Sequence, residues 1–381
     1  MRTADLARLN KPYPETLDPI DADAMEAIPL RLPNWTTLEN EVFADFTMQH
    51  PYGIGWWAPD PGARCRILIS DQLYCCLVSV PSNMTEAVLH WLEYLDASDR
   101  DSARFADAVK MTPSGPTMSP PKPRTAYEQL GPDFMRIHQA GIIRALASAL
   151  DCLAGVIIGV AALPLSILRA DFAKARRKFG TIDGAGSDGA SIQAQLSRRL
   201  EATIADVGPP GWLDWTLDFR NMLVHRGRRI ELGQYLPLEP VLYGPDGHPA
   251  QPARRISHLP RDPGRSDVEV FLDGTPGNLV LHEEATRTLE GLMRCTTNLL
   301  ETTATYMLEF WRWRRAHPAD LRQPQTQWPD GPSIQSTGFN GYAPNSPHFN
   351  PQIGMMHPVN ERRFRAAALD DAARPQWTTF D

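Results

Sequence analysis

The chain has 381 residues, of which 42% are hydrophobic and 22% charged, and this composition supplies a sizeable core for a soluble protein. The net charge of −7 argues against a protein coated with positive charge, as chromatin and ribosomal proteins often are, so any contact with nucleic acid must be local. The five cysteines form no Cys-x-x-Cys pair, which argues against a disulfide framework and against a zinc site. No apolar stretch follows the N-terminus, so we expect no secretion signal and place the protein in the reducing cytoplasm.

Residues 1–120 are predicted to form a mixed α/β region, to which the sequence assigns no role. An amphipathic stretch runs from Thr37 to Met48. We interpret the apolar run from Cys65 to Val80 as extended, and we expect a separate helix from Met84 to Leu95.

The next region, residues 121–229, is predicted to be a helical bundle. It follows Thr112–Pro123, a segment with five prolines that we interpret as a linker and a domain boundary. Apolar residues then recur at spacings of three and four, as on the buried face of a helix. The expected helices run from Gly131 to a stop or kink at Pro164, from Leu165 to Phe179, from Ser191 to Val207 and from Trp212 to Arg226.

The apolar run from Cys152 to Leu168 is the one membrane candidate in the sequence. It is at the short end of what spans a bilayer, Pro164 lies inside it and Asp151 directly precedes it. We therefore interpret it as a buried helix and expect no membrane association, with a membrane anchor as the weaker alternative.

Residues 230–280 are predicted to be an insertion that interrupts the bundle. The strand-like stretch Val268–Leu272 precedes an Asp-Gly turn, which predicts a short β-hairpin. Helical spacing returns from Leu281 to Arg315, so the bundle is completed by residues 281–316. The remainder, residues 317–381, is rich in proline and asparagine and is predicted to be an extended or partly disordered tail.

The helix Trp212–Arg226 carries the residues that point to chemistry. At 100° per residue, one core-facing stripe within about 100° is formed by Trp212, Trp215, Phe219, Met222 and Leu223. A polar ridge of Asp214, Asp218, Asn221 and His225 lies elsewhere on the helix, and Arg220 falls among apolar neighbours. Such an arginine must extend to solvent or meet a carboxylate or a phosphate, because an unpaired buried charge is strongly destabilising.

The segment from Arg220 to His225 reads R-N-M-L-V-H, and it resembles the R-N-x-x-x-H motif of the HEPN superfamily. The similarity covers residues 131–316 and includes Ala147–Asp151, which is similar to the early helix of many such domains. The resemblance implies a helical bundle and a metal-independent endoribonuclease or an RNA-binding relative, of the kind found in toxin and antiviral defence systems. It also implies a homodimer that brings two motif helices together.

The resemblance and the chemistry of RNA suggest a role for each motif residue. His225 would transfer protons to or from the 2′-hydroxyl and the leaving oxygen, and Arg220 would stabilise charge on the phosphate. Asn221 would orient the imidazole or bind the phosphate. Arg220 and His225 are five residues apart and point about 140° from each other on a straight helix, so a second protomer would complete the site. We expect no metal and no cofactor.

An alternative reading is open for the same residues. Arg220 could pair with a carboxylate of a neighbouring helix, while Asn221 and His225 belong to an ordinary solvated ridge. The chain would then be a non-catalytic module that dimerises or holds RNA, an inhibitor or another protein partner. The sequence leaves open which reading holds.

Two clusters of arginine are candidates for contact with the RNA backbone. They follow the motif helix and close the last helix, where Trp311 and Trp313 could stack a base; the residues are Arg226, Arg228, Arg229, Arg312, Arg314 and Arg315. The alternative is that these charges complement helix dipoles while the tryptophans pack in the core. Arg312 and His317 repeat the bare Arg-x4-His spacing without the asparagine, and we interpret that repeat as coincidence.

Overall fold

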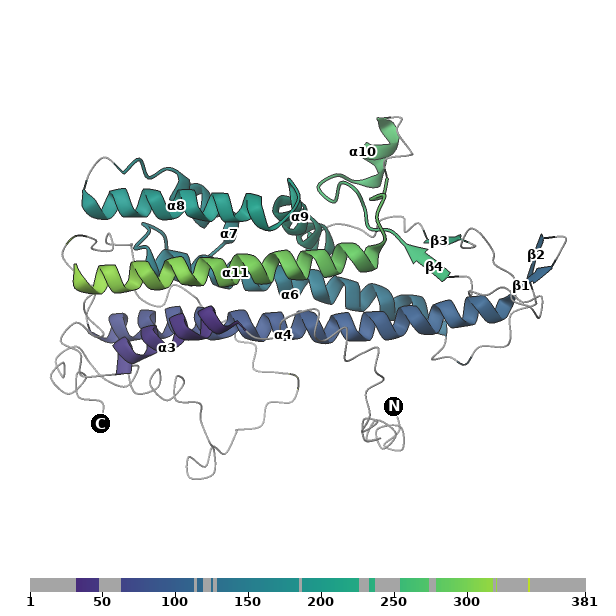
Figure 1. Ribbon diagram of the computed structural model, residues 1–381, viewed down its shortest axis with the longest axis horizontal. Coiled ribbons are helices and arrows are strands. Elements are labelled where there is room, and N and C mark those ends of the chain that lie inside the picture. The colour runs from purple at the N-terminus through teal and green to yellow at the C-terminus, as the bar shows by residue number, and fades with distance from the viewer. Residues whose placement is uncertain are drawn as a thin grey trace, which may run out of the picture. The chain divides into compact units, whose positions relative to one another are not determined.

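The protein is mainly α-helical, as the sequence predicts (Figure 1). The computed structural model describes residues 32–47, 63–112, 115–118, 125, 129–184, 187–225, 233–236, 254–273, 279–317, 320 and 342. The chain divides into two compact units: a first unit of Met1–Arg31, Thr85–Ile142 and Gly227–Arg294, and a second unit of Leu32–Met84, Ile143–Arg226 and Cys295–Asp381.

Six long helices dominate the described residues. They are α3 (Pro33–Thr47), α4 (Ala63–Ala108), α6 (Gly131–Val160), α8 (Asp188–Val207), α9 (Trp212–His225) and α11 (Ala285–Ala316). Shorter elements are the 3-10 turn η1 (Ile167–Arg169), α7 (Phe172–Gly180) and α10 (Asp267–Leu272). Helices α4, α6 and α11 contribute residues to both units.

Two antiparallel strand pairs accompany the helices. β1 (Val109–Thr112) pairs with β2 (Gly115–Met118), and β3 (Gly233–Leu236) pairs with β4 (Arg254–Ser257). The β1–β2 pair takes up the start of the proline-rich segment that we interpreted as a linker.

The helices predicted for the bundle are confirmed as α6, α8, α9 and α11, with ends within a few residues of those expected. The expected helix Leu165–Phe179 is shorter: η1 precedes it, and α7 begins only after Asp171, whose side chain accepts from the Lys174 N–H. The predicted tail lies outside the described residues apart from positions 317, 320 and 342.

The expectation of an extended run from Cys65 to Val80 is wrong, because these residues belong to α4, which continues through the expected helix Met84–Leu95. In the second unit, Leu73, Leu77, Val80 and Met84 are buried at spacings of four, three and four, which is a helical stripe. The two expected elements are one continuous helix, with Pro81 inside it.

Pro81 lies inside α4, and the hydrogen bond that a proline cannot make is replaced there by another donor. A proline has no N–H for the carbonyl four residues earlier, here that of Leu77, and its ring displaces that carbonyl. The indole Nε1–H of Trp35 donates to the Leu77 oxygen at 2.8 Å, and both Trp35 and Leu77 are fully buried. Helix α3 thus supplies the partner that α4 lacks.

The predicted strand at Val268–Leu272 is also wrong. These residues form α10, which begins with a capping box: Ser266 accepts from the Glu269 N–H, and the Glu269 carboxylate accepts from the Ser266 N–H. Local capping therefore outweighs the β-branched composition. The strand pair of this insertion lies earlier, at β3 and β4.

Helix α6 is long and apolar enough to cross a membrane, and most of its apolar window is buried within the protein. In the second unit, its residues from 143 to 160 are buried except for Arg144, Ser148, Asp151 and Cys152. This burial on nearly every side matches the interpretation of a core helix.

The C-terminal end of α6 lies in the interior and its carbonyls are bonded there. The Leu163 N–H donates to the Ile158 oxygen at 3.0 Å around Ala162, whose φ of 53° is left-handed. The fully buried Arg314 of α11 donates from Nη1 to the oxygens of Gly159 and Val160, at 2.7 and 3.0 Å. A buried helix end needs such partners, so Arg314 of α11 caps the C-terminal end of α6.

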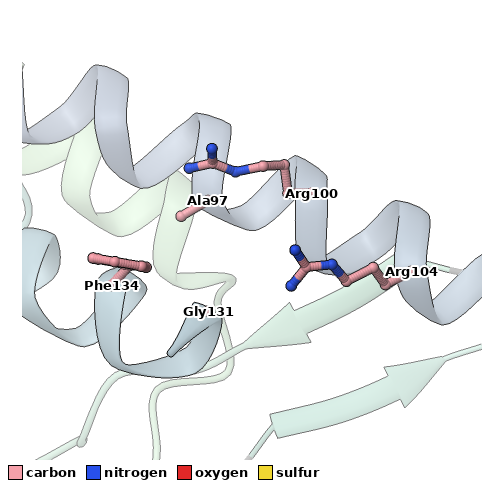
Figure 2. A pocket seen from close by; sticks show the side chains of 5 residues that line it. All are labelled: Ala97, Arg100, Arg104, Gly131 and Phe134. Atoms are coloured by element: carbon pink, nitrogen blue, oxygen red, sulfur yellow. The ribbon is translucent and has the colours of Figure 1, made fainter. Parts of the chain in front are cut away.

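In the first unit, the N-terminal turns of α6 lie beside α4 (Figure 2). His90 of α4 and His138 of α6 approach through their Nδ1 atoms at 3.1 Å. The hydroxyl of Tyr94 on α4 lies 3.1 Å from that of Ser257 at the end of β4. These contacts join α4, α6 and the insertion within this unit.

We predict that Trp35→Phe destabilises the protein by about 1–3 kcal/mol, because the buried Leu77 oxygen loses its donor. In a Pro81→Ala background the new N–H at position 81 can reach that oxygen, so the same substitution should cost about 1 kcal/mol less. Urea unfolding of the four proteins measures this coupling, and strictly additive effects would contradict the account of Pro81.

Candidate functional site

Helix α9 is oriented by the burial of one of its faces. The buried side chains are those of Trp212, Leu213, Thr216, Phe219 and Met222. Trp212 Nε1 donates to the Ile204 oxygen of α8 at 3.0 Å, which anchors the first turn. The stripe predicted from the helical wheel is therefore confirmed in the main.

The predicted polar ridge is exposed where the structure describes it. Asp214, Asp218 and Asn221 are all exposed. Asp214 lies 3.4 Å from Arg176 of α7 in an open ion pair. His225 is the last residue of α9, and its side chain lies outside the described residues. The position and the role of the His225 imidazole therefore stay predictions.

Arg220 has a carboxylate partner on a neighbouring helix. Its Nη2 donates to Asp151 Oδ2 of α6 at 2.7 Å, and the two side chains keep 26% and 32% of their surface exposed. The pair is thus neither enclosed nor fully solvated. If Arg220 only supports the fold, it is expected to pair with a carboxylate of a neighbouring helix, and this contact is such a pair. The contact also holds the guanidinium at the surface of the second unit.

Asp151 also contacts helix α7. Its other oxygen, Oδ1, accepts from the Phe172 N–H at 3.1 Å, in the first turn of α7, where the Phe172 side chain is fully buried. The carboxylate therefore joins α6, α7 and α9. Burial raises the pKa of Asp151 above its ordinary value, and the Phe172 N–H and the charge of Arg220 oppose that rise.

A second arginine links α6 to the end of α9. Arg144 Nη2 lies 3.4 Å from the Leu223 oxygen in the last turn of α9. Arg144 and Asp151 are seven residues apart and so share a face of α6. Along a helix that is otherwise buried in the second unit, this face of α6 presents polar side chains to α9.

Asp151 was not singled out as a functional residue from the sequence. It entered only as the last residue of the segment Ala147–Asp151 and as the charge that precedes the apolar run Cys152–Leu168. The pattern that could have identified it is the composition of α6, since Asp151 is the only acidic residue between Phe134 and Val160. A lone carboxylate in an apolar helix needs a partner, and Arg220 had been predicted to need one.

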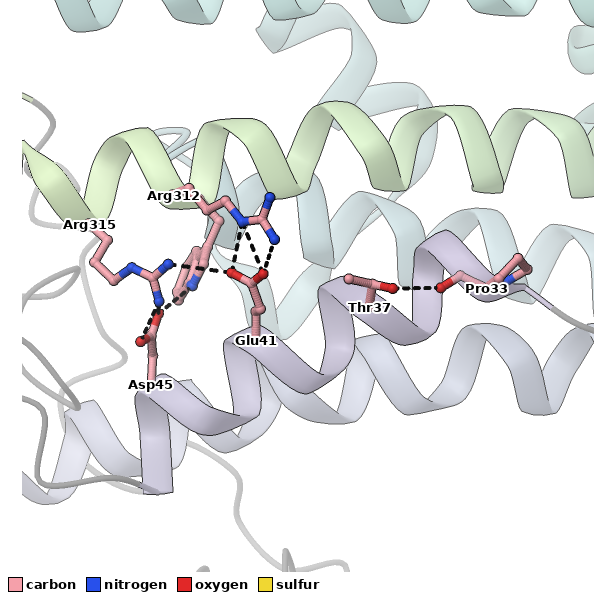
Figure 3. A network of polar contacts seen from close by, with 7 residues as sticks. Pro33, Thr37, Glu41, Asp45, Arg312 and Arg315 are labelled. Carbon is pink, nitrogen blue, oxygen red and sulfur yellow. Dashed lines mark hydrogen bonds and ion pairs between the residues drawn. The ribbon is translucent and has the colours of Figure 1, made fainter.

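The predicted RNA-binding arginines of α11 are all engaged within the second unit. Arg312 pairs with Glu41 of α3, and Arg315 lies 3.0 Å from Asp45 (Figure 3). Arg314 is enclosed and caps α6. To bind RNA, Arg312 and Arg315 would have to exchange these carboxylates for phosphates.

Trp311 and the three arginines after the motif helix were also predicted to contact RNA. Trp311 is fully buried and donates from Nε1 to Asp45 Oδ2 at 2.6 Å, so it packs rather than stacks on a ligand. The arginines that follow the motif helix, Arg226, Arg228 and Arg229, lie outside the described residues.

No family model matches the chain, and no curated protein or solved structure matches it. The resemblance to HEPN domains therefore rests on the motif residues and their place in a helical protein.

We predict a pH dependence of stability from Asp151. A carboxyl whose pKa is raised by folding stabilises the folded state below its unfolded value, and that contribution is lost as pH rises through the folded value. The free energy of unfolding of the wild type, relative to Asp151→Asn, should thus fall as pH rises above 3.8. Urea unfolding at a series of pH values tests this, with Asp214→Asn as the exposed control. A relative stability that grows with pH would mean that the ion pair outweighs burial.

Proposed function

We propose that the chain is a metal-independent endoribonuclease that cleaves RNA by attack of the 2′-hydroxyl. The observation that carries the proposal is the placement of Arg220, whose guanidinium is half-buried, fixed by Asp151 and next in sequence to the exposed Asn221. A guanidinium has five N–H donors in a rigid fork, so a bond to Asp151 leaves donors that can bind a phosphate.

The proposed reaction needs only proton transfer and charge stabilisation. The 2′-hydroxyl is already adjacent to the phosphorus, and an imidazole with a pKa near neutrality can accept its proton or protonate the leaving oxygen. His225 has this role in the proposal, and Arg220 stabilises the charge that develops on the phosphate. Asn221 orients the imidazole or adds a donor to the phosphate, and Arg226, Arg228 and Arg229 contact the RNA backbone.

The proposal includes a homodimer through α9. Arg220 and His225 lie five residues apart on one helix, so a second copy of α9 would bring an arginine of one protomer to a histidine of the other. Val224 supports this arrangement, because an apolar side chain that is 53% exposed between the two residues is suited to burial against a partner.

A non-catalytic module is the second candidate function. The same ion pair favours it, because Asp151 already satisfies the charge of Arg220 and ties α9 to α6 without any ligand. In this case α9 would serve dimerisation or the binding of RNA, an inhibitor or another protein. A role as a toxin or an antiviral defence effector belongs to the endoribonuclease proposal.

We predict that the purified protein cleaves total RNA in EDTA and that Arg220→Ala and His225→Ala each lower the rate by roughly 10²–10⁴-fold. Asn221→Ala should lower it less. His317→Ala is the matched control, because His317 ends the other Arg-x4-His sequence of the chain and is exposed. Intact RNA with the wild type, or equal loss with His317→Ala, would refute the enzyme.

Asp151→Asn separates catalysis from support of the fold. If Arg220 acts on the phosphate, Asp151 is a positioning residue, and Asp151→Asn should cleave more slowly than the wild type but faster than Arg220→Ala. If Arg220 serves only the fold, both variants should lose stability while any cleavage by the folded fraction is unchanged.

We predict that Val224→Asp weakens self-association by about tenfold or more, because it places a charge in the proposed dimer interface. Leu168→Asp is the matched control, since Leu168 is a 48% exposed apolar residue of the same unit away from α9 in sequence. Sedimentation velocity over a range of concentrations measures the change. A wild type that stays monomeric at all concentrations would remove the dimer from the proposal.

A further inference from the structure

Two histidines join α4 to α6 in the first unit. His90 and His138 approach through their Nδ1 atoms at 3.1 Å, with ring centroids 5.3 Å apart and ring planes inclined at 55°. A neutral imidazole has one N–H and one lone pair, so such a contact is a hydrogen bond only when one Nδ1 donates and the other accepts. The pair therefore keeps its hydrogen bond only while at least one of the two rings is neutral.

The His90 ring lies directly against the backbone of α6. Gly141 is one turn after His138, and a Cβ there would lie 2.4 to 2.6 Å from three atoms of the His90 imidazole. The ring thus has no room to move further toward α6, while 29% of the side chain is exposed and open to protons from solvent. A repulsion between the two rings can be relieved only if His90 leaves α6 or if the helices part.

Charged groups of α4 surround the pair. Glu86, one turn before His90, lies 3.8 Å from His90 Nε2 and offers a carboxylate to a protonated ring. His138 is influenced by Glu93, which favours its protonated form, and by His90 and Arg100, which oppose it. Burial has the largest effect and lowers the pKa of His138. The last proton that the pair takes up is therefore the one on His138.

We propose that the pair of His90 and His138 is a proton-sensitive contact, which holds α4 to α6 in neutral solution and loosens the two helices when acid protonates both rings. A doubly protonated pair has N–H groups on both facing nitrogens and two positive charges, so repulsion replaces the hydrogen bond. The contact does not require the ribonuclease activity proposed above, because both histidines belong to the first unit.

The pH range of the change follows from His138. A histidine whose pKa is lowered by folding stabilises the folded state above its unfolded value, and that contribution is lost as pH falls through the folded value. The ordinary value is 6.5, so the helices should loosen below pH 6.5. Exposed carboxylates such as Glu86 and Glu93 ordinarily take up protons only near pH 4, so their titration is separated from that of the histidines.

The test is amide hydrogen exchange of the full chain at about pH 7.5 and about pH 5, the range in which histidine changes charge, with each rate corrected for intrinsic exchange. We expect protection of residues 85–104 of α4 and 131–142 of α6 to fall by about tenfold at the lower pH, which corresponds to the loss of one hydrogen bond. Residues 143–160 of α6 are the internal reference and should change less. Unchanged protection of the first two segments in the wild type would overturn the proposal.

His138→Asn removes the titration and keeps a hydrogen-bonding group near the position of Nδ1. The amide can donate to His90 Nδ1 or accept from it, so this variant should retain at the lower pH the protection that the wild type loses. His258→Asn is the matched control, because His258 is in the same unit and its Nδ1 lies 3.0 Å from the backbone oxygens of Leu281 and Glu283. Protonation does not break such a contact, so His258→Asn should lose protection as the wild type does.

His90→Asn is a second variant, which keeps the test decisive if asparagine at position 138 disturbs the fold. Histidine NMR follows His138 in this variant, where the pKa of His138 should be higher than in the wild type because the charge of His90 is gone. The same titration of His138 with and without His90 would overturn the proposal. So would a loss of protection at the lower pH that is as large in both asparagine variants as in the wild type.

Discussion

The second unit depends on closing the C-terminal end of α6 inside the protein. A helix leaves its last carbonyls without backbone partners, and here they lie where water cannot supply them. Arg314 bonds the oxygens of Gly159 and Val160, and Gln193 of α8 donates to that of Ala161. Burial lowers the pKa of Arg314, the expected direction for a cation removed from water, and the two carbonyl dipoles offset that desolvation. Helices α8 and α11 are therefore tied to α6 by its unpaired end as well as by apolar packing.

With α6 fixed in this way, the placement of the candidate site follows from the few polar side chains of that helix. Asp151 reaches both Arg220 and the Phe172 N–H, and Arg144 reaches the end of α9. Together with the burial of one face of α9, these contacts orient the helix so that the ridge containing Asn221 is exposed. Burial raises the pKa of Asp151, and its two partners oppose that rise, so desolvation of the carboxylate offsets part of what the contacts with Arg220 and Phe172 contribute.

The sequence predicts those parts of the fold in which one local pattern dominates. Spacings of three and four identified α6, α8, α9 and α11, and the wheel identified Arg220 as a residue in need of a partner. Prediction failed for Cys65–Val80, which was interpreted as extended but belongs to α4. There a distant residue contributes, because Trp35 donates to the Leu77 oxygen that Pro81 leaves without a backbone partner. It failed again at α10, where the capping box outweighs the β-branched composition. The identity of the partner, Asp151, required the packing of α6 against α9, which no single-helix pattern contains.

The arginines of this acidic chain differ in function according to what surrounds each guanidinium. Arg314 is enclosed and meets carbonyls, so its role is structural. Arg312 and Arg315 meet the carboxylates of α3, and Arg312 lowers the pKa of Glu41, so an RNA phosphate would have to displace a bound carboxylate there. Arg220 is intermediate, because it is paired yet keeps part of its surface accessible. A phosphate gains most where a guanidinium is already oriented but not enclosed, and this criterion separates Arg220 from the arginines of α11 more sharply than charge or spacing can.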